Sequence, residues 1–306
     1  MIVRPRENWF RMLFIWNGSV LQSIIPQLLF MAVFSSLAVL THGRILGEKI
    51  PLNTTPFTLF GLALAIFLAF RNTASYARFD EARHLWGNLL IASRALTSQV
   101  LCYLPERTSP TDRTLLANRL IAFVYALKHQ LRKTDPVPDL TRLLGAGQAE
   151  ALRQKCYRPA VILNDIRHQL AQLQGPASVS DTTRWMLDAQ LNELGKTVGG
   201  CERIASTPIP FAYGVLLHRT AYAYCMLLPF GLVDSTEFFT PLLCVFISYT
   251  LIALEAIANE VAEPFGLAPN ALALDAITRT IERSILELCD RPLPEETVPQ
   301  RPYQLT

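Results

Sequence analysis

Four apolar runs constrain this sequence more than any other feature. They cover residues 19–40, 58–70, 210–232 and 238–258. A helix needs about 20 apolar residues to cross the hydrocarbon core of a membrane, and all but the second run reach that length. Hydrophobic residues make up 51% of the chain and charged residues 17%, a balance that does not suit an ordinary soluble protein. We therefore predict an all-α integral membrane protein with about four membrane-region helices.

The second run is too short to match a bilayer, which indicates a helix surrounded by other helices rather than by lipid. Small residues would let neighbouring helices approach it closely. These residues are Gly61, Ala63, Ala65 and Ala69.

The third run carries His218 and Arg219 inside apolar sequence, so one side of this helix must face protein or water. We expect these side chains to bond to a neighbouring helix rather than to bind a substrate. Pro229 and Gly231 predict a break near the outer end of the helix.

Arginines cluster on one side of the predicted spans. They are Arg4, Arg6, Arg11, Arg71, Arg78, Arg83, Arg279, Arg283 and Arg291. Because positive charge is retained on the cytoplasmic side, this pattern predicts a multi-pass protein of the inner cell membrane with both termini in the cytoplasm.

Leu62, Ile66 and Phe70 recur every four residues and therefore form an apolar stripe on one helix face. The stripe is either a seam that packs against another helix or a hydrophobic constriction. The second interpretation requires several copies of the helix around one axis, where an apolar ring can gate ions by excluding water.

Acidic residues gather near the two ends of the fourth run. Asp234 and Glu237 precede it, and Glu255, Glu260 and Glu263 lie at its other end. They could attract cations. For the second group, a polar helix end that supplies partners to neighbouring arginines is the interpretation we favour.

We divide the chain into four segments. Residues 1–71 hold the first two membrane helices with the stripe, and residues 72–207 form a large cytosolic helical region. Residues 208–262 hold the third and fourth membrane helices, and 263–306 form a cytosolic C-terminal segment with a proline-rich, disordered tail. Within the cytosolic region, Leu85, Leu89, Ala92 and Leu96 have the spacing of a buried helix face.

Features of enzymes and nucleic-acid-binding proteins are missing from the sequence. The five histidines are isolated, and there is no nucleophile elbow or phosphate-binding glycine loop. A net charge of +3 is too small to indicate a nucleic-acid partner, and six widely separated cysteines predict free thiols. We predict no enzyme activity, no cofactor and no metal site.

Several short motifs, in order along the chain, are similar to those of the bestrophins, and of their bacterial branch in particular. They are Trp16-Asn17-Gly18-Ser19, the stripe followed by Arg71-Asn72, RFDEARHLWG at 78–87, TPIPFAY at 207–213, Leu228-Pro229-Phe230-Gly231 and Glu263-Pro264-Phe265-Gly266. The resemblance implies a ring of five identical subunits in a lipid bilayer, with an ion path along the axis. It also implies that Leu62, Ile66 and Phe70 form the neck of the pore.

The resemblance implies a second constriction in the cytosolic region, and counting back from Pro210 places it at Thr182, where the family prefers an apolar residue. Animal bestrophins bind calcium through acids after their Pro-Phe-Gly, whereas this chain has Ala268 and Ala271 there. Calcium control of the animal kind is therefore not expected. Resemblance to the bacterial branch favours small monovalent cations such as sodium.

Two other classes of function remain open on the sequence. A secondary transporter would need polar groups that converge at mid-membrane, for which His218 and Arg219 are the main indication. A membrane-anchored scaffold or signalling protein would act through its cytosolic helices.

Overall fold

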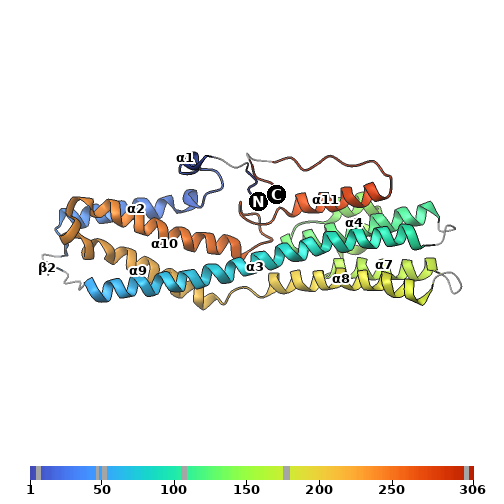
Figure 1. Ribbon diagram of the computed structural model, residues 1–306, viewed down its shortest axis with the longest axis horizontal. Coiled ribbons are helices and arrows are strands. Elements are labelled where there is room, and N and C mark those ends of the chain that lie inside the picture. The colour runs from blue at the N-terminus through green and yellow to red at the C-terminus, as the bar shows by residue number, and fades with distance from the viewer. Residues whose placement is uncertain (5–7, 46–47, 50–53, 105–108, 175–179, 300–302) are drawn as a thin grey trace. The chain divides into compact units, whose positions relative to one another are not determined.

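The computed structural model describes residues 1–4, 8–45, 48–49, 54–104, 109–174, 180–299 and 303–306. Its elements, in chain order, are α1 (Trp9–Met12), α2 (Leu21–Leu40), β1 (Arg44–Ile45), β2 (Glu48–Lys49), α3 (Thr54–Tyr103), α4 (Pro110–Arg132), α5 (Val137–Leu144), α6 (Ala146–Arg153), α7 (Arg158–Gln174), α8 (Asp181–Ser206), α9 (Phe211–Thr236), the 3₁₀ turn η1 (Glu237–Phe239), α10 (Thr240–Ala262) and α11 (Leu274–Leu288) (Figure 1). The predicted helical fold is confirmed, and β1 and β2 form only a short antiparallel hairpin.

The chain forms two compact units. The membrane unit comprises residues 4–79 and 208–264, and the polar unit comprises residues 1–3, 80–207 and 265–306. The long helix α3 contributes its first part to the membrane unit and its remainder to the polar unit. Each unit is therefore assembled from segments that lie far apart in the sequence.

Among the described residues, three helical stretches are long and apolar enough to cross a membrane. They are Leu21–Leu40, Thr55–Tyr103 and Phe211–Ala262. The last stretch contains α9 and α10, which pack against each other on either side of η1 and so make two passes. The four predicted membrane helices are thus all present as helices.

The core of the membrane unit joins all four of these helices. Its buried residues are Met31 on α2, Leu64 and Leu68 on α3, Leu217, Ala221 and Cys225 on α9, and Leu251 on α10. Gly61 has a clear role beside this core, because a Cβ atom there would lie 2.5 Å from the hydroxyl oxygen of Tyr224. The Tyr224 ring in turn stacks on Phe57 with ring centroids 4.6 Å apart.

One sequence prediction about the membrane helices is wrong. Pro229 and Gly231 do not break α9, which continues to Thr236. Membrane helices tolerate proline when neighbouring groups satisfy the freed backbone, and Pro229 is buried in the helix packing. Within the described part of this chain, only 11% of the most apolar window of the second span is buried.

In the polar unit, α4 is the central helix and packs against α5, α7 and α11. Its residues from Leu120 to Leu127 are all buried, which is the pattern of a helix covered on every side. The predicted buried face of α3 is confirmed for three of its four residues: Leu89 and Leu96 are fully buried and Ala92 is 5% exposed, whereas Leu85 is half-buried.

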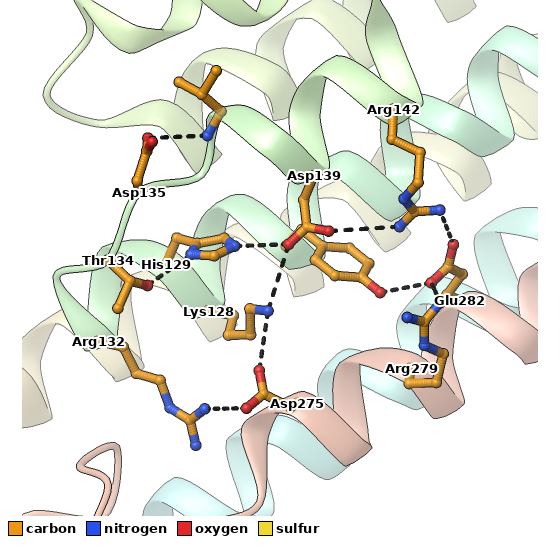
Figure 2. A network of polar contacts seen from close by, with 12 residues as sticks. Lys128, His129, Arg132, Thr134, Asp135, Asp139, Arg142, Asp275, Arg279 and Glu282 are labelled. Atoms are coloured by element: carbon orange, nitrogen blue, oxygen red, sulfur yellow. Dashed lines mark hydrogen bonds and ion pairs between the residues drawn. The ribbon is translucent and has the colours of Figure 1, made fainter. Parts of the chain in front are cut away.

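A network of charged side chains attaches α11 to α4 and α5 (Figure 2). The carboxylate of Glu282, only 1% exposed, accepts hydrogen bonds from Tyr125 Oη at 2.6 Å and Arg142 Nη1 at 2.6 Å. Arg279 donates a further bond to it at 2.8 Å. A buried carboxylate is stable when it is held by this many donors, so Glu282 fixes α11 in place.

The other half of the network surrounds Asp139 and Asp275. Asp139 bonds to His129 Nε2 at 2.9 Å, and Asp275 accepts from Arg132 Nη1 at 2.6 Å. Lys128 Nζ lies between the two carboxylates, 3.6 Å from Asp139 and 3.0 Å from Asp275. Burial alone raises the pKa of each aspartate, but the bonded and charged neighbours outweigh burial and hold the pKa below its ordinary value of 3.8.

The two ends of the chain pair with each other inside the polar unit. Ile2 and Gln304 form an antiparallel β-bridge, and the Val3 amide donates to the Tyr303 carbonyl at 2.8 Å. The Ala276 amide, in the first turn of α11, donates to the carbonyl oxygen of Thr306 at 3.0 Å. Residues 291–299 of the tail have no regular secondary structure.

All six cysteines are free thiols, as predicted. Cys201, Cys225 and Cys244 are buried, whereas Cys102 and Cys156 are exposed. Burial, followed by the charge of Glu202, raises the pKa of the Cys201 thiol to about 12, so this thiol stays protonated at neutral pH.

The charged network predicts how stability depends on pH. Because the folded pKa of Asp139 and Asp275 is lowered, their contribution is complete above the unfolded value and is lost as the pH falls below 3.8 through the folded values. We expect Asp139→Asn and Asp275→Asn each to lower the stability at pH 7 by about 1–3 kcal/mol, and to reduce the further loss between pH 6 and pH 3.

Thermal unfolding followed by circular dichroism, at pH 7, pH 6 and pH 3, measures this effect. Asp165→Asn is the matched control, because Asp165 is exposed on α7 and makes no ion pair with any described residue. An equal loss of stability in the control would contradict a specific role for the network.

Candidate functional site

The apolar stripe lies on an open face of α3. Leu62, Ile66 and Phe70 are 59%, 47% and 68% exposed, whereas Leu64 and Leu68 on the opposite face are buried. A helix places residues four apart on nearly the same side, so the three stripe residues lie on one face of α3 and the two buried leucines lie on the other. Among the residues that the structure describes, no helix covers the stripe, so it is not a packing seam within this chain.

A polar cluster around the buried Glu255 begins directly after the stripe. It consists of Arg71 on α3, His218 on α9, and Glu255 and Asn259 on α10. Glu255 is 5% exposed, and its Oε1 atom lies 2.9 Å from His218 Nδ1 and 3.6 Å from Arg71 Nη1. Arg71 Nη2 donates a hydrogen bond of 2.5 Å to Asn259 Oδ1.

The contacts in the polar cluster offset the cost of burying the charge of Glu255. An ionised carboxylate is costly to bury unless opposite charges and donors surround it, and Glu255 has one arginine and one histidine in contact. Two sequence predictions are therefore confirmed in part. His218 bonds to a neighbouring helix, but Arg219 makes no bond with any described residue. Glu255 is a partner for an arginine, but Glu263 pairs with none in the described part of the chain. The negative charge of Glu255 is balanced within its own chain.

About two turns further along α3, Arg78 supports the packing of α3 against α10. Its Nε atom donates a hydrogen bond of 3.1 Å to the carbonyl oxygen of Ala262, the last residue of α10. The final carbonyls of a helix have no partner inside that helix, so this bond satisfies one of them.

The structure does not bring the five predicted acids together. Asp234 and Glu237 are exposed at the end of α9, whereas Glu255 contacts His218 near its beginning. Sixteen residues of helix separate His218 from Asp234, which corresponds to about 24 Å. Glu260 is half-buried and Glu263 is exposed, so the acids form two groups at opposite ends of the membrane helices.

Thr182 is exposed in the first turn of α8. Ser180 caps this helix, because its hydroxyl oxygen accepts a hydrogen bond of 3.1 Å from the Thr183 amide. Trp185 lies one turn further along and is 72% exposed. Residues 175–179, just before this helix, lie outside the part of the chain that the structure describes.

Sequence reasoning did not foresee the contact between Arg71 and Glu255. A charged residue inside an apolar span signals that a partner must exist. That signal was available for both residues, but it does not say which residue is the partner. As for metals, no three His, Cys, Asp or Glu side chains gather as a metal site would require, within the residues that the structure describes.

The polar cluster predicts a large effect of removing one charge. Glu255→Leu leaves the Arg71 guanidinium buried without a counter-charge, so we expect a loss of about 3–5 kcal/mol in stability. The double variant Arg71→Met, Glu255→Leu removes both charges and should recover most of the loss. Glu263→Ala, which removes an exposed acid, should change stability by less than about 0.5 kcal/mol.

Thermal unfolding of the purified protein in detergent gives this comparison. If Glu255→Leu unfolds at the same temperature as the unmodified protein, the ion pair does not stabilise the membrane unit.

Comparison with known proteins gives consistent matches over nearly the whole chain. Residues 1–287 match the model of the family described as Bacterial/Fungal Bestrophin protein. A voltage-dependent anion channel-forming protein of Ralstonia nicotianae is 44% identical over 95% of both chains. Its counterpart in Escherichia coli strain K12 is 41% identical over the full length of both.

Solved structures give the same result. The crystal structure of a bacterial bestrophin homolog from Klebsiella pneumoniae has a TM-score of 0.83 and 43% sequence identity. The match covers 88% of this chain and 99% of that one.

Proposed function

Because the chain belongs to the bacterial and fungal bestrophin family, we propose that it is the subunit of a homopentameric channel for small monovalent ions. The observation that carries this proposal is the exposed apolar stripe on α3. In a single chain, exposing Leu62, Ile66 and Phe70 has no energetic benefit. Around a five-fold axis, the same three residues from each subunit would form successive apolar rings.

The chemistry of the stripe suits a neck that controls ion passage. Its three side chains carry no charge and no hydrogen-bonding group, so they cannot replace the hydration shell of an ion. A narrow apolar passage can therefore close by losing its water. Ala65 and Ala69, which are exposed on the same part of α3, are small enough to allow neighbouring copies of the helix to approach closely.

Widening the neck should raise ion flux. We expect Ile66→Ala and Phe70→Ala to increase the single-channel conductance severalfold, because a shorter side chain admits water at the constriction. Leu68→Ala is the matched control: Leu68 is fully buried on the opposite face of the same helix. It should cost about 2–5 kcal/mol of stability without a comparable rise in conductance.

Recording in planar bilayers measures this prediction. Equal conductance in well-folded Phe70→Ala and unmodified protein would show that the stripe does not line the ion path.

We propose a second constriction formed by the start of α8. Thr182 is its predicted residue, and the exposed Trp185 lies close by on the same helix. A ring that includes Trp185 would restore the apolar character that Thr182 lacks.

We propose that the channel selects cations over anions. Asp234 and Glu237 place carboxylates on the exposed end of α9, where they can raise the local concentration of cations. Arg71, the charged residue next to the neck, has its charge balanced by Glu255. The curated relatives are named as anion channel-forming proteins, so chloride is the second candidate ion.

The reversal potential in asymmetric sodium chloride distinguishes the two ions. We expect a value near the sodium equilibrium potential, and a shift toward zero in the double variant Asp234→Asn, Glu237→Gln. Asp165→Asn, which removes an exposed acid from the polar unit, should leave the value unchanged. A reversal potential near that of chloride would establish an anion channel instead.

We also propose the inner cell membrane as the location, with both termini in the cytoplasm. The flanking arginines support this orientation, and both chain ends belong to the same unit. If bilayers that contain folded protein show no current, a secondary transporter or a membrane-anchored scaffold becomes the better description.

A further inference from the structure

Two cavities in the membrane unit share a wall. The first, called here the polar cavity, has a volume of about 440 Å³ and is lined by the polar cluster together with Arg219 and Glu263. The second, called here the apolar groove, has a volume of about 560 Å³. Arg71, Ile209 and Pro210 line both. A polar site therefore opens beside an apolar one.

The apolar groove is lined mainly by hydrocarbon. Besides the shared wall, its residues are Phe67, Phe70, Ala74, Tyr213, Leu216 and Leu217. Phe67 and Leu216 are more than half exposed, so their surface is available to something outside the chain. Such a surface gains free energy when an apolar group covers it.

Among the charged side chains that line the polar cavity, one cation and one anion have no ion-pair partner in the described part of the chain. Glu255 is already balanced by Arg71 and His218. Arg219 and Glu263 are exposed and make no ion pair with any residue in the described part of the chain.

We propose that the two cavities together bind a zwitterionic glycerophospholipid with a primary ammonium group. Its phosphate would accept hydrogen bonds from Arg219, and its ammonium group would pair with Glu263. An acyl chain would occupy the apolar groove. A headgroup with one charge of each sign matches the two unpaired side chains, whereas a purely anionic headgroup leaves Glu263 without a partner.

The neighbouring groove argues against a small soluble zwitterion. A soluble ligand could fill the polar cavity, but it would leave Phe67 and Leu216 uncovered. A membrane lipid presents both chemistries in one molecule and is present at high concentration around a membrane unit. This proposal concerns bound lipid, and it stands or falls separately from ion conduction.

Native mass spectrometry of the whole protein, released from nanodiscs, tests whether the polar cavity binds the lipid headgroup. Phosphatidylethanolamine, phosphatidylcholine and phosphatidylglycerol with the same acyl chains are offered in turn, and retained lipid per subunit is counted. We expect phosphatidylethanolamine to be retained in preference to the other two. Arg219→Gln and Glu263→Gln should each weaken its retention about tenfold, because each removes a charged contact.

Arg11→Gln is the matched control, since Arg11 is an exposed arginine of the membrane unit outside both cavities. Equal retention of all three lipids, a preference for phosphatidylglycerol, or an equal loss in Arg11→Gln would each overturn the proposal. Arg219 and Glu263 are exposed, so their neutral variants are expected to fold and the comparison remains decisive.

The variant Ala74→Trp tests whether the apolar groove binds an acyl chain, because Ala74 is exposed and its replacement fills the groove. We expect less retained phosphatidylethanolamine and an unchanged oligomer mass in mass photometry. Unchanged lipid retention with a smaller oligomer would show that a second copy of the chain, and not lipid, covers the groove.

Discussion

A charge inside the membrane must find its partner within the protein, and the contact of Glu255 with Arg71 and His218 meets this requirement. It joins α3, α9 and α10 at one point. Phe70 and Arg71 are adjacent, so their side chains differ by about 100° around the axis of α3. Holding Arg71 against α10 therefore sets the rotation of α3. That rotation buries Leu68 and leaves the apolar stripe exposed.

The polar unit also contains a buried carboxylate that needs partners. This carboxylate is Glu282, and it is held by a tyrosine and two arginines from three helices. Because α11 follows the last membrane helix in sequence, this contact decides where the C-terminal part of the chain docks. In both units, one buried carboxylate with several donors fixes helices that apolar packing alone could place in more than one way.

Much of the fold follows from local sequence pattern, and much of the site does not. Apolar length and spacing predicted the four membrane helices and the buried face of Leu89 and Leu96, because those signals repeat within a single helix. Pro229 misled the prediction, since its local preference is overridden by packing. The pairing of Arg71 with Glu255 connects residues 184 positions apart, a distance over which spacing carries no information. Likewise, only the tertiary fold reveals which face of α3 is open.

The pairing of Ile2 with Gln304 bears on how the chain is made. Gln304 follows α9 and α10 along the chain, so this bridge forms only after both membrane helices have been synthesised. By then α9 and α10 can enter the membrane. Biosynthesis therefore has a natural order, in which the spans are available for insertion before Ile2 and Gln304 pair in the polar unit.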